Sequence, residues 1–179
     1  MKSTLVAILA ALVLMVGSAF AQDKVELSGA YQFSAAYANG QQINSNPGWN
    51  ASATYYLGHS GLGIVTEWSG TNFNGNFSAG TKSFAVNTGA GGLQYQFFRK
   101  SALRPYVNVL LGDTKYTTSG PANSFSQQVG GGVDLSITKH FAVRGGLTYL
   151  HDTAATVAGV GNLTSANQIK PIGGIVIRF

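Results

Sequence analysis

The sequence predicts an all-β fold: an eight-stranded antiparallel up-and-down barrel that crosses a membrane with its strands. Three observations predict it. Residues 22–179 divide into segments in which apolar and polar side chains alternate, as they do in strands with two different faces. Only 9% of the 179 residues are charged, which is far below the usual share of about 25% in soluble domains. Short turns also alternate with longer polar loops along the chain, which is typical of transmembrane barrels.

The first residues have the layout of a secretory signal. Lys2 is followed by the apolar stretch LVAILAALVLMVG of 13 residues, and Ala19 and Ala21 are the small residues that a signal peptidase requires. An uncleaved membrane anchor is disfavoured, because a bilayer span needs about 20 apolar residues. We therefore expect a cleaved signal over residues 1–21 and a barrel over residues 22–179.

Eight strands are expected, each with one apolar face and one small or polar face. Their ranges are 24–37, 49–57, 62–68, 82–97, 104–116, 125–137, 141–151 and 168–179. In chain order, the apolar faces include Val25 and Leu27, Trp49 and Tyr55, Leu62 and Ile64, Leu93 and Tyr95, Val107 and Val109, Val129 and Val133, Phe141 and Val143, and Ile175 and Ile177. The opposite faces carry mainly Ser, Thr, Gln, Asn and Gly. A soluble sandwich would instead place Lys and Glu there.

The connections fall into two classes. GHSG, FRKSALR and TKH are short and follow the second, fourth and sixth strands. ANGQQINSNPG, SGTNFNGNFSAGT, TTSGPANS and DTAATVAGVGNLTSAN are generally longer and follow the other strands. Because transmembrane barrels have short periplasmic turns and longer extracellular loops, both termini are expected on the periplasmic side.

Aromatic residues gather at the predicted strand ends, as two interfacial belts require. Aromatic residues favour strands in general, but a bias toward strand ends favours the membrane interpretation. At the outer ends are Tyr37, Trp49, Trp68, Tyr116, Phe125 and Tyr149; at the inner ends are Tyr55, Tyr56, Phe97, Phe98, Tyr106, Phe141 and Phe179.

Three stretches, RPYVNVLLG, GGGVDLSITKHFAVRGGLTYL and IGGIVIRF, resemble small bacterial outer-membrane barrels. The family is that of the eight-stranded barrel domain of outer-membrane protein A and of the surface-opacity and virulence-associated barrels. The resemblance implies a non-enzymatic protein of the bacterial outer membrane that supports envelope integrity and presents surface loops. It implies as partners the outer-membrane lipids and lipopolysaccharide, the barrel assembly machinery and periplasmic chaperones. It further implies that the terminal strand is an assembly signal, formed by Gly173, Ile175, Ile177 and Phe179.

Six charged residues are predicted to face the lumen: Glu26, Glu67, Asp134, Arg144, Lys170 and Arg178. Unpaired charges would be costly there, so we expect them to pair within a plug. Centring the TKH hairpin on Lys139 places Asp134 opposite Arg144, because the lipid-facing residues of both strands fix the register. Glu26 and Arg178 lie in the first and last strands, which must meet to close the barrel. A stabilising plug and a narrow channel for ions or small solutes remain open alternatives at this point.

Other chemistry has weaker support. YLHDTAAT places His151, Asp152 and Thr153 at an outer strand end, and small barrels that resemble lipid A deacylases carry a His and a Ser near that level. Here Thr stands in place of Ser, so a lipid-modifying enzyme is only a remote alternative. The chain has no Cys, and His59, His140 and His151 are too scattered for a zinc site. The net charge of +5 comes without dense Lys and Arg clusters, which argues against nucleic-acid binding. No cofactor or metal is expected.

Overall fold

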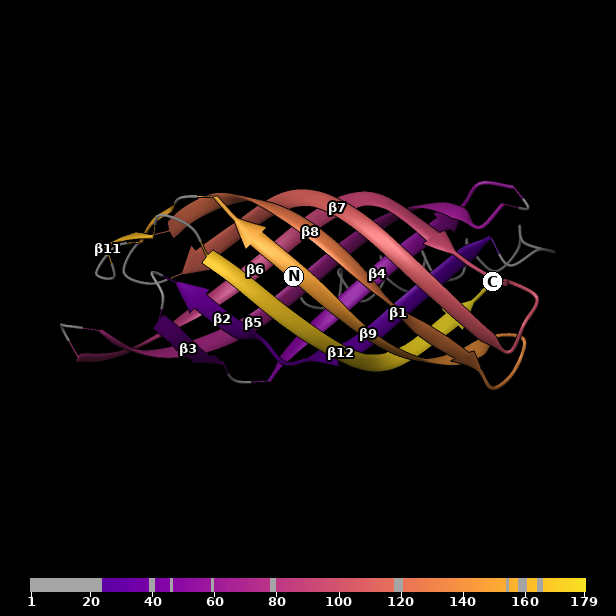
Figure 1. Cartoon of the computed structure of the whole chain (residues 1–179), viewed down its shortest axis with the longest axis horizontal. Coiled ribbons are helices and arrows are strands. Elements are labelled where there is room, and N and C mark those ends of the chain that lie inside the picture. Colours follow the sequence, from indigo (N-terminus) through magenta and orange to yellow (C-terminus); the bar gives the residue numbers. More distant parts are fainter. Residues whose placement is uncertain are drawn as a thin grey trace, which may run out of the picture.

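Eight antiparallel strands close into a barrel in the computed structural model (Figure 1). The structure describes residues 24–38, 41–45, 47–58, 60–77, 80–117, 121–153, 155–157, 161–163 and 166–179. The predicted signal over residues 1–21 lies outside these ranges. No helix of membrane-spanning length and apolarity occurs among the residues described.

Each barrel strand is continuous except the first two. The strands are β1 (Val25–Gln32), β2 (Ala35–Ala38), β3 (Gln41–Ser45), β4 (Gly48–Tyr56), β5 (Leu62–Phe77), β6 (Gly80–Gln96), β7 (Leu103–Thr117), β8 (Pro121–Ser136), β9 (Phe141–Asp152) and β12 (Ala166–Arg178). β1 with β2 forms the first barrel strand, and β3 with β4 forms the second. The short pair β10 (Ala155–Val157) and β11 (Gly161–Leu163) lies apart as a second sheet.

Pairing of the first and last strands closes the ring. β1 pairs on one side with β4 and on the other with β12, with Glu26 in register with Arg178 and Gln32 with Ile172. Main-chain bonds extend this seam, because the amide of Lys24 donates to the carbonyl of Phe179 at 3.0 Å. An open edge would leave main-chain groups without partners in lipid, so closure is the condition for crossing a membrane.

The two ends of the barrel differ. β4–β5, β6–β7 and β8–β9 are joined by short turns at the end that also holds the C-terminus, whereas β2, β3 and β11 lie at the opposite end (Figure 1). We call these the short-turn end and the hairpin end. In the turn after β6, Phe98 has a φ of 50°, a left-handed conformation that non-glycine residues rarely adopt.

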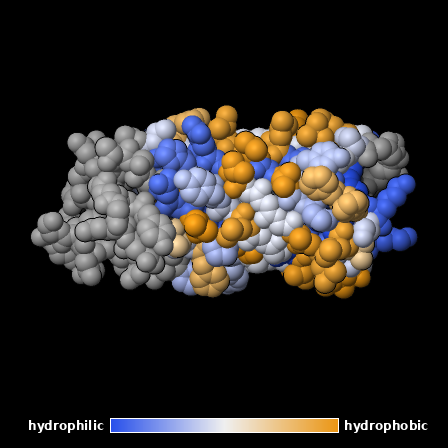
Figure 2. Space-filling model, viewed as in Figure 1, coloured by the Kyte–Doolittle hydropathy of each residue, from blue (hydrophilic) through white to orange (hydrophobic). Residues whose placement is uncertain are grey.

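Side chains alternate strictly between the lumen and the outer wall. In β7, Val107, Val109 and Leu111 are exposed on the wall, while Tyr106, Asn108 and Leu110 are buried in the lumen. The outer wall is therefore apolar over its middle part, with hydrophilic residues toward the ends (Figure 2). This is the inside-out pattern that the strand faces predict.

The strands at the hairpin end are longer than the sequence predicts. β5 continues to Phe77 and β6 begins at Gly80, so most of the stretch expected to be a loop after Trp68 is a paired hairpin. Similarly, β7 runs to Thr117 and β8 begins at Pro121. The Asn, Gly and Ser residues in these stretches suggested loops. Antiparallel pairing starts in the barrel wall and satisfies their main-chain groups, so the hydrogen bonds between the strands continue beyond the wall.

For three tyrosines the assignment to an aromatic belt is wrong. Tyr56, Tyr106 and Tyr116 are buried in the lumen instead, because each is at one of the alternate strand positions that face inward. Eight other belt residues are at least 40% exposed on the wall: Trp49, Trp68, Phe125 and Tyr149 at the outer level, and Tyr55, Phe97, Phe98 and Phe141 at the inner level. Phe179, also assigned to the inner belt, is only partly exposed. The side chains of Tyr37 and of other residues in the hairpin tips lie outside the described part.

Candidate functional site in the barrel lumen

The six charged residues predicted for the lumen all lie there. They come from β1, β5, β8, β9 and β12 and have at most 4% of their surface exposed. They divide into two groups. Glu26, Asp134, Arg144 and Arg178 meet near the short-turn end, whereas Glu67 and Lys170 lie apart from them.

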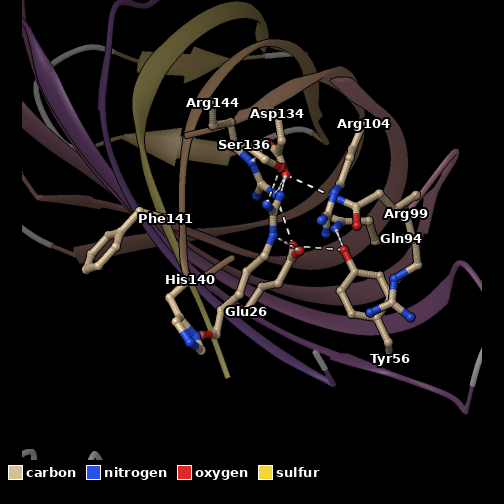
Figure 3. A network of polar contacts seen from close by, with 12 residues as sticks. Glu26, Tyr56, Gln94, Arg99, Arg104, Asp134, Ser136, His140, Phe141 and Arg144 are labelled. Atoms are coloured by element: carbon tan, nitrogen blue, oxygen red, sulfur yellow. Dashed lines mark hydrogen bonds and ion pairs between the residues drawn. The ribbon is translucent and has the colours of Figure 1, made fainter. Parts of the chain in front are cut away.

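The four residues near the short-turn end form a closed ring of ion pairs, which we call the charge ring (Figure 3). Arg144 Nε lies 2.7 Å from Asp134 Oδ1, and Arg178 Nη2 lies 3.1 Å from Asp134 Oδ2. Arg178 Nε lies 2.7 Å from Glu26 Oε1, and Arg144 Nη2 lies 3.4 Å from Glu26 Oε2. The signs alternate around the ring, so each buried charge has two neighbours of opposite sign.

Neutral polar side chains complete the charge ring. The Tyr56 hydroxyl donates to Glu26 Oε2 at 2.9 Å and accepts from Gln94 Nε2 at 2.8 Å. Gln96 Nε2 donates to Asp134 Oδ2 at 3.0 Å. Arg178 Nη1 donates to the Ser136 hydroxyl at 2.7 Å. Satisfied buried charges are held rigidly, because releasing one would leave its partners unpaired in a medium of low dielectric.

Strand register explains why these residues meet. Asp134 and Arg144 face each other across the β8–β9 hairpin, and Glu26 faces Arg178 across the closing seam. These are the two pairings that the hairpin and closure arguments predict. The Arg144 guanidinium also lies 4.4 Å from the centre of the Tyr106 ring, an attractive cation–π geometry.

Glycines make room for that ring. A Cβ on Gly146 would lie 2.5 Å from the Tyr106 hydroxyl, and one on Gly132 would lie 2.9 Å from it. Gly132 and Gly146 are paired across β8 and β9. The Gly-rich segment of β8 thus accommodates a lumenal tyrosine, which is the close packing that a strand glycine allows.

The hairpin-end half of the lumen holds the other two charged residues, Glu67 and Lys170. Lys170 Nζ lies 3.4 Å from Gln128 Oε1 and 3.5 Å from Ser69 Oγ. Within the described ranges, Glu67 Oε1, Asn108 Oδ1 and Gln128 Nε2 are buried without a hydrogen-bond partner. Buried polar groups of this kind usually bind ordered water.

A second hydrogen-bonded group lies beyond Lys170. The Tyr116 hydroxyl donates to Asp152 Oδ2 at 2.6 Å, and Gln168 Nε2 lies 3.4 Å from the same oxygen. Sequence reasoning missed these roles, and it also missed Tyr56 and Arg104 as lumenal residues. Strand parity could have found all of them, since Tyr116 shares the parity of Asn108, and Asp152 that of Arg144.

His151 does not form a nucleophile–base pair with Thr153. Its Nδ1 lies 2.7 Å from Asn167 Oδ1, which also accepts from the Tyr149 hydroxyl at 2.9 Å. The Thr153 hydroxyl donates instead to the carbonyl of Phe125 at 3.2 Å. Among the residues that the structure describes, no three His, Asp or Glu side chains are grouped as a metal site would require. His59 lies outside them.

Comparisons with known proteins agree with this architecture. Residues 6–170 match the family model described as outer membrane protein beta-barrel domain. A search of curated proteins finds no match.

Three solved structures are similar in fold. Neisserial surface protein A matches with 14% identity and a TM-score of 0.69, covering 87% of this chain and 97% of that one. Ail, the attachment invasion locus protein of Yersinia pestis, has 14% identity and a TM-score of 0.59, with coverages of 88% and 100%. OprG from Pseudomonas aeruginosa has 13% identity and a TM-score of 0.60, with coverages of 88% and 96%. Because the family model spans most of the sequence, the chain belongs to the outer membrane protein beta-barrel domain family and resides in the bacterial outer membrane.

Proposed function

We propose that this protein is a non-enzymatic barrel with a plugged lumen, which strengthens the envelope and presents extracellular hairpins. The charge ring is the observation that carries the plug. It joins the neighbouring strands β8, β9, β12 and β1, and Tyr56, Gln94 and Gln96 extend it to β4 and β6. Its four charged side chains are at most 4% exposed. An eight-stranded barrel has an interior that side chains can fill, so a continuous buried network there leaves little room for a pore.

Conductance across a planar bilayer tests the plug. The wild-type barrel should give no steady, discrete openings. The double variant Glu26→Ala/Arg178→Ala removes one member of each sign and should create openings, since it shortens two side chains without changing net charge. The matched control, Asp113→Ala/Lys115→Ala, is also charge-neutral but lies on the exposed wall, and it should remain silent. Steady openings of the wild-type barrel would overturn the plugged lumen.

The second candidate function is a narrow channel for ions or small solutes. The buried, unpartnered oxygens of Glu67 and Asn108 favour it, because they would be hydrated and could line a short aqueous vestibule. The charge ring would then be the constriction at its inner end. The same bilayer measurement separates the two functions.

Contact with the environment is proposed for the hairpin end. Support comes from the paired strands of β5 and β6, which continue past the aromatic level of Trp68 and project a long hairpin. One structural neighbour bears the name attachment invasion locus protein, which is consistent with a surface role on this scaffold. Adhesion would be supported if labelled cells bind the wild-type protein and this binding is lost when the hairpins are shortened, with the yield of folded barrel unchanged.

Lipid modification is the function that the geometry supports least. A Ser or Thr nucleophile needs its base within hydrogen-bond reach, and Thr153 is hydrogen-bonded to Phe125 instead. Release of fatty acid from lipopolysaccharide that is abolished by His151→Ala would overturn the non-enzymatic proposal.

A further inference from the structure

Among the residues that the structure describes, the short-turn end carries exposed positive charge and no exposed acidic side chain. Lys100 and Lys139 are exposed, and Lys24 and Arg99 are partly exposed. The described Asp and Glu side chains are buried in the lumen, except Asp113, which is exposed toward the hairpin end of β7. At this end the main-chain oxygen of Phe179 accepts hydrogen bonds from the amides of Lys24 and Val25.

Two of these cations lie beside a groove in the β6–β7 turn. The groove has a volume of about 610 Å³ and is lined by Tyr95, Gln96, Phe98, Arg99, Lys100 and other turn residues. Tyr95 is 43% exposed and Phe98 is 73% exposed, so the groove has an aromatic side and a cationic side.

The turn holds these groups in fixed positions. Arg99 Nη1 donates to the carbonyl of Ser60 at 3.2 Å, and the Arg99 guanidinium lies 4.1 Å from the centre of the Tyr56 ring. The Ser101 amide donates to the carbonyl of Phe98 at 2.8 Å, which fixes the left-handed residue. Tyr95 and Phe97 pack edge to face with centroids 4.8 Å apart. A groove anchored in this way is available without reordering of the turn.

We propose that this groove binds an anionic phospholipid of the inner leaflet. The phosphate would lie against Lys100 and Arg99, and the start of the acyl chains against Phe98 and Tyr95. A diacyl phosphate is the occupant that matches both sides of the groove. Aromatic rings prefer the level where headgroups meet acyl chains, and cations there attract anionic lipid. A cell-wall peptide has negative charge but no long apolar part, so it would leave the exposed Phe98 ring unexplained.

Native mass spectrometry of the folded barrel in neutral detergent tests this site. The probes are dioleoylphosphatidylglycerol and dioleoylphosphatidylcholine, which differ in net charge but have the same acyl chains. The wild-type barrel should retain the phosphatidylglycerol in preference to the phosphatidylcholine. Lys100→Gln should weaken its retention about five-fold, since one cation near an anionic headgroup contributes about 1 kcal/mol. Lys100→Arg should keep it.

Two further variants separate the contributions. Phe98→Ala should weaken retention of both lipids, because it removes the contact with the acyl chains. Lys115→Gln removes an exposed lysine at the hairpin end and should change neither. Heat-modifiable gel migration confirms that each variant is folded, since a folded barrel resists detergent until it is boiled.

Three results would overturn the proposal. The first is equal retention of the two lipids by the wild-type barrel. The second is full competition by glycerol phosphate, which would mark a site for free phosphate without acyl chains. The third is binding of a soluble anionic cell-wall peptide that depends on Lys100 while lipid retention does not.

Discussion

Asp134 is the residue on which most of the lumen network converges. Its two oxygens accept four hydrogen bonds, two from Arg144 and one each from Arg178 and Gln96. It is fully buried. The carboxylate therefore depends on these donors for its charge to be stable, and the two arginines depend on it in turn.

Replacing Asp134 by Asn should be strongly destabilising. The change leaves Arg144 and Arg178 with a single carboxylate between them, and breaking a buried ion pair typically costs about 3–5 kcal/mol. We expect the free energy of unfolding in urea, measured for the barrel in lipid vesicles, to fall by about that amount. Asp113→Asn is the matched control on the exposed wall and should change stability by about 0.5 kcal/mol or less. Equal stability of the two variants would contradict the role of the ring.

Two adjacent glycines give a test of lumen packing. Gly146→Val should destabilise the barrel by about 1–3 kcal/mol, because the added methyl groups would overlap the Tyr106 hydroxyl and displace the ring from Arg144. A Cβ on Gly145 would meet nothing within 4 Å, so Gly145→Val should be close to neutral. Urea unfolding of both variants checks the difference. Similar losses for the two would show that Tyr106 does not limit packing at this level.

The alternation of strand residues between lipid and lumen explains which contacts of single residues could be predicted from the sequence. Lipid-facing Leu135 and Val143 fix the hairpin register, and that register places Asp134 opposite Arg144. The roles of Tyr56 and Tyr106 could not be predicted by counting aromatic residues at strand ends, because a tyrosine can serve either the belt or the lumen. Only its parity decides, and the hydroxyl then finds a buried partner.

At the scale of elements, the hairpin of β5 and β6 continues well beyond the apolar wall. The two strands pair from Leu62 with Tyr95 to Phe77 with Gly80. Phe73 and Val86 are buried in its outer portion, and main-chain pairing continues beyond them to the tip.

Shortening this hairpin should leave the barrel intact. Replacing residues 74–83 by Asn-Gly joins Phe73 to Phe84, which are already paired, through a turn that suits a two-residue hairpin. Heat-modifiable migration should persist, and the free energy of unfolding should change by about 1 kcal/mol or less. Loss of the folded band would show that the hairpin tip is needed for barrel folding.

The sequence could not define where these hairpins end. Asn, Gly and Ser in residues 69–81 have low strand propensity, so their composition predicts a loop. Strand formation there depends on the partner strand, because each pairing in the wall positions the next residue pair outward. The short turns at the opposite end were predicted well, since Ile137 and Phe141 leave few residues to connect β8 to β9.

At the scale of the whole molecule, closure depends on the last residues. The Phe179 amide donates to the carbonyl of Val25 at 2.9 Å, and the Phe179 carbonyl accepts from Lys24 and Val25. Deleting Phe179 removes these bonds together with the aromatic residue of the proposed assembly signal. We expect the amount of folded protein in the outer membrane to fall more than it does for the 74–83 replacement. Normal membrane yield of the truncated chain would count against the assembly signal.

The closing seam also determines the order in which the barrel can form. Glu26 and Arg178 are 152 residues apart in sequence and touch directly. Neighbouring hairpins can form as soon as their own residues are present, whereas this contact must wait for the final strand and carries the largest loop-closure entropy. Until then the chain is a sheet with two open edges and an incomplete set of buried charges. We therefore expect the unclosed sheet to be aggregation-prone, and the ring of buried charges to be completed in one late, cooperative step.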